Sequence, residues 1–367
     1  MNRREFLGGV AGGIAASALE GCFPLGADRA AYSVAILGDT HFDAEPESVY
    51  HAHYDESNRW ANIQHEEFRR NGEMWRGRCR ELLAASAALA AMRPTDFVLQ
   101  TGDIIQGDCD DVPTHKRMLD DCIRMLRAPY PAGLPFLTVV GNHDVRGKGA
   151  REAYFEFAET FLAKELGRPV RYPAFSFRKG ADLWTFCDFE TRDLAPVIAE
   201  IERAPDARYT FLVTHGPFTA CEDSFPAWRL GGSRACDALR PKLYELLSQR
   251  HAVVLSGHSH LTALYRHENA FGGFTEFTAN SVWKAPELAT DEPICEGAAE
   301  YGKRAAAKLS GKRQDEFARA AEEFRPGLKD YYLSAGAGHY RLNASDDGVT
   351  FSYYPGAAKV PARVWCA

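Results

Sequence analysis

Five short polar clusters in this chain share one arrangement, because each follows directly on an apolar run of strand length. The clusters are Gly38-Asp39-Thr40-His41, Gly102-Asp103, Gly141-Asn142-His143-Asp144, Thr214-His215-Gly216 and Gly257-His258-Ser259-His260. Imidazole nitrogens, carboxylate oxygens and amide oxygens are ligands of borderline divalent metals. A Gly-Asp pair by itself is usually a turn, and a single His-x-His is usually structural. Five such clusters, each at the end of an apolar run, together predict one metal site.

The elements that must position these clusters alternate along the chain. The apolar runs are Tyr32–Leu37, Phe97–Gln100, Phe136–Val140, Tyr209–Val213 and Ala252–Leu255. Helical patterns lie between several of them, at Arg76–Met92, Thr114–Leu126, Arg151–Leu166 and Asp237–Gln249. Strands that alternate with helices predict an α/β core, and continuous apolar runs are typical of strands buried on both faces. The polar clusters then lie at the carboxyl ends of the strands, where open α/β sheets usually carry their sites.

The order of the motifs resembles the calcineurin-like metallophosphoesterase family. That family's pattern is GDxH, GD, GNHD or GNHE, a single His after a later strand, and GHxH. This chain has GDTH, GD, GNHD, THGP and GHSH in the same order, over about residues 32 to 265. The resemblance implies a four-layer αββα sandwich and a site that binds two metal ions drawn from iron, manganese and zinc.

The resemblance also implies how the ligands divide. Asp39, His41 and His260 would hold one metal ion, Asn142, His215 and His258 would hold the other, and Asp103 would bridge the two. Family members that are purple have a Tyr three residues after the bridging Asp. This chain has Gln106 there, so an iron bound by tyrosinate is not expected.

The expected chemistry is hydrolysis of a phosphoester. Two divalent ions bring four positive charges and the two Asp ligands return two, so the site attracts phosphate. A metal pair can clamp phosphate oxygens and supply a bridging hydroxide that attacks phosphorus in line with the leaving alkoxide. The family pattern makes His143 the group that stabilises or protonates the leaving oxygen, with Asp144 orienting its imidazole and raising its pKa.

Two segments fall outside the repeating pattern. Residues 44–75 are polar and aromatic and are interpreted as an insertion over the site. Residues 284–327 carry a charged, Ala-rich helical pattern from Glu296 to Phe324, interpreted as a cap or a side helix. Asp346-Asp347-Gly348 between two apolar runs predicts a closing hairpin. We therefore expect residues 31–367 to form one metallophosphoesterase domain that includes both segments.

Residues 1–30 are interpreted as a signal peptide and linker. Arg3-Arg4 followed by Phe6-Leu7 and a short Gly- and Ala-rich run resembles a bacterial twin-arginine signal. An ordinary basic N-terminus is the alternative. Cleavage could follow Ala16-Ser17-Ala18, or Cys22 could become a lipidated N-terminus and attach the protein to a membrane. Either signal predicts export to the periplasm or cell envelope of a bacterium.

Composition limits the remaining possibilities. The chain has 367 residues, a net charge of −7 and 46% hydrophobic residues, which is typical of a globular protein and predicts no specific nucleic-acid partner. None of the nine cysteines forms a CxxC pair, and no disulfide framework is expected.

The expected substrate is a phosphomonoester or a small nucleotide or phospholipid phosphodiester. The alternative is a non-catalytic metal-binding or scaffolding protein that retains the fold. No pattern indicates an oligomeric state.

Overall fold

A computed structural model describes residues 31–43, 50–51, 59–77, 79–171, 174–219, 236–282, 289–307, 322–323 and 325–367. Its first half contains these elements: β1 (Tyr32–Leu37), α1 (Arg59–Arg76), α2 (Cys79–Met92), β2 (Phe97–Gln100), α3 (Val112–Arg127), β3 (Phe136–Thr138), α4 (Ala150–Leu166), β4 (Phe175–Lys179), β5 (Asp182–Cys187) and α5 (Ala195–Arg203). Its second half contains these: β6 (Thr210–Thr214), α6 (Arg240–Gln249), β7 (Val253–Ser256), β8 (Thr262–Asn269), β9 (Gly272–Thr278), β10 (Cys295–Glu296), α7 (Ala298–Ala307), η5 (Arg325–Gly327), β11 (Leu328–Ser334), β12 (Gly338–Ser345), β13 (Gly348–Pro355) and β14 (Arg363–Cys366).

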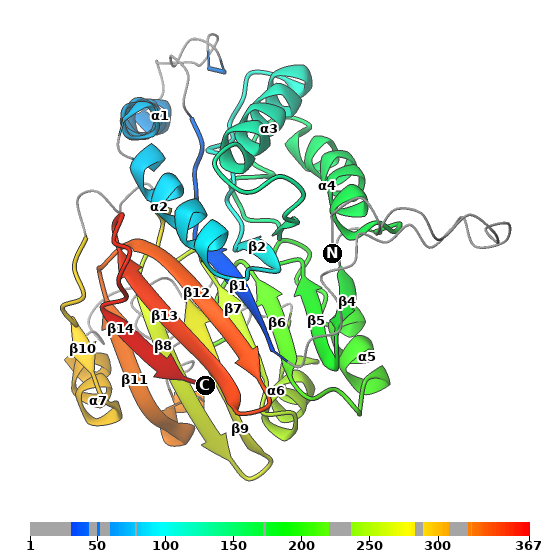
Figure 1. Cartoon of the computed structure of the whole chain (residues 1–367), viewed down its shortest axis with the longest axis vertical. Coiled ribbons are helices and arrows are strands. Elements are labelled where there is room, and N and C mark those ends of the chain that lie inside the picture. Colours follow the sequence, from blue (N-terminus) through cyan, green and yellow to red (C-terminus); the bar gives the residue numbers. More distant parts are fainter. Residues whose placement is uncertain are drawn as a thin grey trace, which may run out of the picture.

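The strands form two sheets (Figure 1). Six strands take the order β14-β13-β12-β1-β2-β3, and eight take the order β10-β11-β8-β9-β7-β6-β5-β4. The pairs β1–β2 and β2–β3 are parallel, as are β5–β6 and β6–β7, so the predicted strands do end at common sheet edges. Antiparallel strands widen each sheet. In the eight-stranded sheet β8 pairs with β9 and with β11, and in the six-stranded sheet β13 pairs with β12 and with β14.

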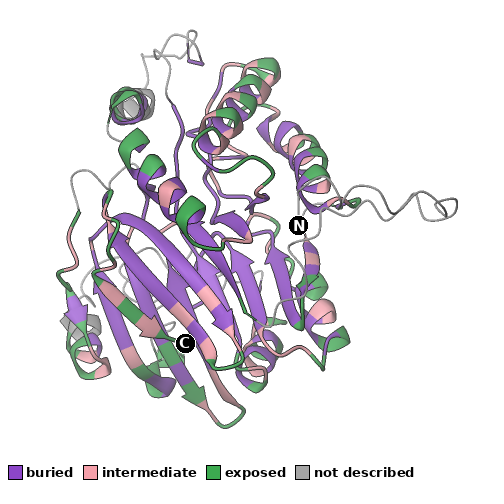
Figure 2. Cartoon of the chain, in the orientation of Figure 1, coloured by how far each residue is buried: buried purple, intermediate pink, exposed green. Residues whose placement is uncertain are grey.

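The core lies between the two sheets and beneath the helices. Aromatic side chains join the inner sheet faces, with Phe97 edge-on to Trp184 at 5.0 Å and Phe277 stacked on Phe351 at 4.6 Å. The helices α2, α3 and α4 cover the six-stranded sheet, and α5, α6 and α7 pack on the eight-stranded sheet. Figure 2 shows that the strands of both sheets are largely buried. The expected four-layer αββα sandwich is therefore confirmed.

The boundaries differ from the expected ones at a few points. The helix expected over Arg76–Met92 begins at Cys79, because Arg76 ends the separate helix α1, which belongs to the insertion. In the second segment, α7 packs on β10 and β11 as a side helix, and residues 308–321 lie outside the described ranges. The closing hairpin is present as β12 and β13. None of the described helices is long and apolar enough to cross a membrane.

The cysteines that the structure describes are free thiols. Six of these seven are buried, and Cys366 is exposed. The six buried cysteines are therefore small packing residues. Residues 1–30, which include the proposed signal and Cys22, lie outside the described part of the chain.

Candidate metal centre

All seven expected ligands come together where the carboxyl ends of the two sheets meet. The loops after β1, β2 and β3 of the six-stranded sheet carry Asp39, His41, Asp103 and Asn142, and the loops after β6 and β7 of the eight-stranded sheet carry His215, His258 and His260. Each expected metal position draws ligands from both sheets. The centre therefore forms only when the two sheets are packed together.

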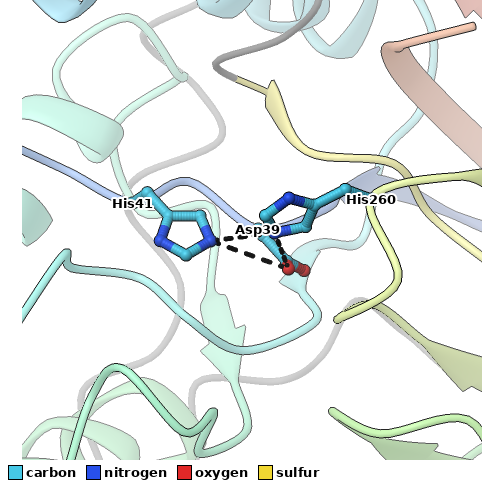
Figure 3. A group of neighbouring side chains, drawn as sticks. All are labelled: Asp39, His41 and His260. Atoms are coloured by element: carbon cyan, nitrogen blue, oxygen red, sulfur yellow. Dashed lines mark hydrogen bonds and ion pairs between the residues drawn. The ribbon is translucent and has the colours of Figure 1, made fainter. Parts of the chain in front are cut away.

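The first ligand set consists of Asp39, His41 and His260, whose side chains point toward one another (Figure 3). His260 Nε2 lies 3.0 Å from Asp39 Oδ2 and 3.0 Å from His41 Nε2. Asp39 is fully buried, and its carboxylate also accepts from the backbone N–H of His258 at 3.0 and 3.1 Å. His41 Nε2 lies 3.9 Å from Asp39 Oδ2, so two imidazole nitrogens face one carboxylate, which is a ligand arrangement that suits a divalent cation.

The second ligand set consists of Asn142, His215 and His258. His215 Nε2 lies 3.2 Å from His258 Nδ1, 3.3 Å from Asn142 Oδ1 and 3.2 Å from Asp103 Oδ2. The same Asp103 oxygen lies 3.6 Å from His41 Nε2 of the first set. Asp103 thus stands between the two sets, in the bridging position expected for it.

Hydrogen bonds behind the ligands fix which ring nitrogen faces the centre. His215 Nδ1 donates to the Thr101 carbonyl at 2.9 Å, and His41 Nδ1 donates to Gln106 Oε1 at 3.0 Å. Both rings therefore present an unprotonated Nε2 to the centre in their neutral form. Residues that ligate a metal are usually held in this way.

The backbone at the centre is strained. His41, Asp103, His258 and His260 have φ values of 41°, 52°, 68° and 54°, a region that side chains other than Gly rarely adopt. Such conformations persist only where the surrounding structure enforces them, and they concentrate at functional sites.

Two glycines of the motifs serve the close approach of these loops. A Cβ on Gly141 would lie 2.2 Å from Asp103 Oδ1, and one on Gly257 would lie 2.3 Å from Asp39 Oδ1. Neither glycine has a positive φ. A side chain at either position would collide with a ligand carboxylate, so both positions require glycine.

The electrostatics of the centre are those of a cation site. Burial raises the pKa of Asp39 to about 6 and lowers the pKa of His41 to about 4. At His215 burial acts to lower the pKa, but the Asp103 and Asp39 carboxylates together raise it to about 10. Burial acts to raise the pKa of Asp103, and the neighbouring His215 and His143 hold it well below its usual range. A bound metal ion would therefore compete with a proton on His215.

His143 lies at the edge of the centre and belongs to neither of the two ligand sets that the resemblance implies, although one of its ring nitrogens lies within 4.8 Å of ligand atoms of His41 and Asp103. Its ring meets the His41 ring edge-on, with centroids 4.4 Å apart, and its backbone N–H donates to Asp103 Oδ1 at 2.7 Å. Its Nδ1 donates to the Gln106 carbonyl at 2.8 Å, which leaves Nε2 as the acceptor. Burial lowers the pKa of His143 well below its ordinary value, so the expected rise is wrong for the protein without metal.

The role expected for Asp144 is also wrong. Its carboxylate accepts from the Gly141 N–H at 2.8 Å and the Ile105 N–H at 3.2 Å, while the Gln106 carbonyl orients His143. Asp144 is fully buried and ties the loop after β3 to the loop after β2. It is a positioning residue for the backbone of these loops.

Several supporting residues were not predicted from the motifs. Asn71 of α1 donates to Gln106 Oε1 at 2.5 Å, and Trp75 of α1 donates from Nε1 to the Thr40 carbonyl at 2.8 Å. Arg146 donates from Nη1 to His143 Nε2 at 3.2 Å. For Asn71 and Trp75 the only sequence signal was the polar and aromatic composition of residues 44–75. Their contacts agree with the position over the site that was expected for this segment.

A dinuclear metal centre fits these residues. Among the described residues, three overlapping groups of His and Asp could hold an ion, and all three belong to this site: Asp39, His41 and His260; His41, Asp103 and His143; Asp103, His215 and His258. In each group the ligand nitrogens and oxygens lie within 4.8 Å of one another, and Asn142 adds an oxygen to the last group. A two-sheet sandwich with such a centre at its strand ends is the architecture expected of a metal-dependent phosphoesterase.

Comparison with known proteins gives the family. Residues 32–262 match the calcineurin-like phosphoesterase family, and the chain belongs to it. It is therefore a hydrolase that acts on phosphoric ester bonds, and its family implies a dinuclear metal centre. No curated protein matches the chain.

Solved structures share the fold at low sequence identity. The structure of PhoD has a TM-score of 0.50 and 11% identity, over 93% of this chain and 69% of PhoD. A dimetal phosphatase from Danio rerio has a TM-score of 0.50 and 11% identity, over 91% of this chain and 98% of its own. At these identities the similarity concerns the fold alone.

Proposed function

We propose that the chain is an exported hydrolase of a phosphomonoester or a small phosphodiester, with two metal ions drawn from iron, manganese and zinc. The observation that carries this proposal is the junction at Asp103, whose Oδ2 lies 3.6 Å from His41 Nε2 and 3.2 Å from His215 Nε2. When bound, the ions would supply Lewis acidity that lowers the pKa of water and neutralises phosphate oxygens.

The chain's own residues provide the charge balance and the proton handling. Asp39 and Asp103 offset two of the four positive charges of a divalent pair, and Asn142 adds an oxygen without charge, so the loaded site attracts a phosphate. His143 keeps a proton on Nδ1 through the Gln106 carbonyl, so that Nε2 is the atom where a proton could be taken up and passed to a leaving oxygen.

A metal-reconstitution assay tests this function. The purified protein is stripped with a chelator, reloaded separately with iron, manganese and zinc, and offered p-nitrophenyl phosphate and bis-p-nitrophenyl phosphate. We expect hydrolysis of at least one ester only after metal addition, and the ratio of the two rates gives the monoester or diester preference. If the protein binds fewer than about one ion per chain and hydrolyses neither ester, it is instead a non-catalytic protein that retains the fold.

The proposed export rests on residues 1–30, through the paired arginines and the small residues that follow. Fractionation of bacteria expressing the full chain tests it. We expect the protein in the periplasm or envelope, and expect Arg3→Lys with Arg4→Lys to retain it in the cytoplasm. A Cys22→Ala variant that moves from the membrane to the soluble periplasmic fraction would support lipid attachment. Equal distribution of all variants would contradict the signal.

A further inference from the structure

The loop after β3 places the Arg146 guanidinium against the ring of His143, the residue proposed to pass a proton to the leaving oxygen. Arg146 Nη1 donates to His143 Nε2 at 3.2 Å. This nitrogen is the one free to accept, because Nδ1 of the same ring donates to the Gln106 carbonyl. The metal ligands and the expected pair of His143 and Asp144 do not account for this arginine.

Arg146 is held rigidly and is still accessible. Its Nε lies 2.5 Å from Asp108 Oδ2, and its carbonyl accepts from the Asp108 N–H at 2.9 Å. Between these loops, a Cβ on Gly107 would lie 2.1 Å from the His143 carbonyl oxygen, and the φ of Gly107 is +72°. The Arg146 side chain nevertheless remains 29% exposed. The guanidinium is therefore in place before a substrate arrives.

Arg146 Nη1 and His143 Nε2 can face one common position. Because these two nitrogens are 3.2 Å apart, a single oxygen can lie within hydrogen-bond distance of both. That position borders the metal centre, since the His143 ring packs edge-on against His41. A guanidinium stays charged and stabilises negative charge without giving up its proton.

We propose that Arg146 is a further catalytic residue that donates a hydrogen bond to the leaving oxygen of the substrate, beside His143. The inference rests on the proposed phosphoester hydrolysis. As the P–O bond breaks, the leaving oxygen keeps the electron pair and Arg146 stabilises its charge. Water supplies the hydroxyl that joins phosphorus and, in the net reaction, the proton that joins the leaving oxygen.

This role predicts a dependence on the leaving group. An alkoxide develops much more charge than p-nitrophenolate, so a donor at the leaving oxygen matters most for alkyl esters. We expect Arg146→Gln to lower kcat about 100-fold for an alkyl phosphate and less than about threefold for p-nitrophenyl phosphate. Arg146→Lys should restore part of the alkyl rate. Both esters are assayed in the monoester and methyl-diester series, with bound metal measured in each variant.

Two variants serve as comparisons. Asp108→Asn removes the carboxylate that holds the Arg146 guanidinium. The backbone accepts this change, because residue 108 has a φ of 53° and Asn tolerates a left-handed backbone. We expect the variant to lower kcat about tenfold for the alkyl phosphate and not for p-nitrophenyl phosphate. Lys148→Gln removes one positive charge from an exposed residue of the same loop and should leave both rates within about twofold.

The outcomes separate this inference from the function on which it rests. Equal losses on both esters, or a loss of metal in both Arg146 variants, would overturn the role of Arg146 while leaving the hydrolase intact. A metal-loaded parent protein that hydrolyses neither ester would overturn the function and this inference together.

Discussion

The two sheets contribute different chemistry to the metal centre. The six-stranded sheet supplies both carboxylates, the amide and one imidazole, whereas the eight-stranded sheet supplies three imidazoles, on His215, His258 and His260. Neither sheet carries a complete ligand set, and Asp103 contacts histidines of both. The metal centre therefore depends on the packing of the two sheets, and changes at the junction should lower metal binding more than changes on either side.

The largest effect is expected at the junction itself. Asp103→Asn removes the charge shared by both sets and leaves His215 without its nearest carboxylate. We expect the variant to lose most of both ions and at least about 1,000-fold in activity, measured by metal analysis and p-nitrophenyl phosphate hydrolysis. The matched control is Asp347→Asn in the exposed β12–β13 turn, which should behave as the parent. An Asp103→Asn protein that keeps two ions would disprove the bridge.

A smaller effect is expected beside the junction, where His143 is outside both ligand sets. His143→Ala should keep both ions but lower kcat about 100- to 1,000-fold, because proton handling at the leaving oxygen is lost. The comparison is Asp144→Asn, which replaces one of the two oxygens that accept from the Gly141 and Ile105 N–H groups with an NH2 donor. It should lower the free energy of unfolding as well as the rate. Unchanged turnover in His143→Ala would remove this residue from the mechanism.

A change behind one ligand set should weaken one ion selectively. Gln106→Leu removes the acceptor of His41 Nδ1 on the six-stranded side and should weaken the ion of the first set about 10- to 100-fold. Titration against a competing chelator measures each affinity. Gln106→Glu keeps an acceptor and should stay within about threefold of the parent. Equal weakening of both ions in Gln106→Leu would argue against separate ligand sets.

The smallest effect concerns acid stability away from the centre. Burial lowers the pKa of His267 on the eight-stranded sheet to about 3, and that of His339 on the six-stranded sheet to about 4. The unfolded chain takes up these protons below about pH 6.5 while the folded chain does not, so stability falls as pH falls from there toward the folded values.

Each of these two histidines should lower the free energy of unfolding by about 1–2 kcal/mol between pH 7 and pH 5. Urea unfolding of the metal-free protein at the two pH values measures this loss. His267→Phe keeps a ring to stack on Phe274 and should make the loss smaller by the contribution of one histidine. A pH dependence identical to that of the parent would show that His267 does not contribute.

The sequence predicted the ligands because their positions follow from strand ends, which the apolar runs mark directly. It failed at Asp144, since adjacency to His143 does not determine where a side chain points, and this carboxylate turns toward the backbone of the β2 loop. Arg146 was missed because its partner Asp108 lies far away in the sequence. The strands β8, β9 and β11 were missed because polar, charged or glycine residues interrupt the apolar residues of each one and leave no continuous apolar run.

Two ligand sets, each drawn from both sheets, should hold two separate ions. The direct test is metal analysis of the parent, His260→Ala and His258→Ala after identical reconstitution, with the exposed His251→Ala as the control. We expect about two ions per chain in the parent and the control, and about one in each of the other variants. Two ions retained in both His260→Ala and His258→Ala, or a single ion in the parent, would contradict it.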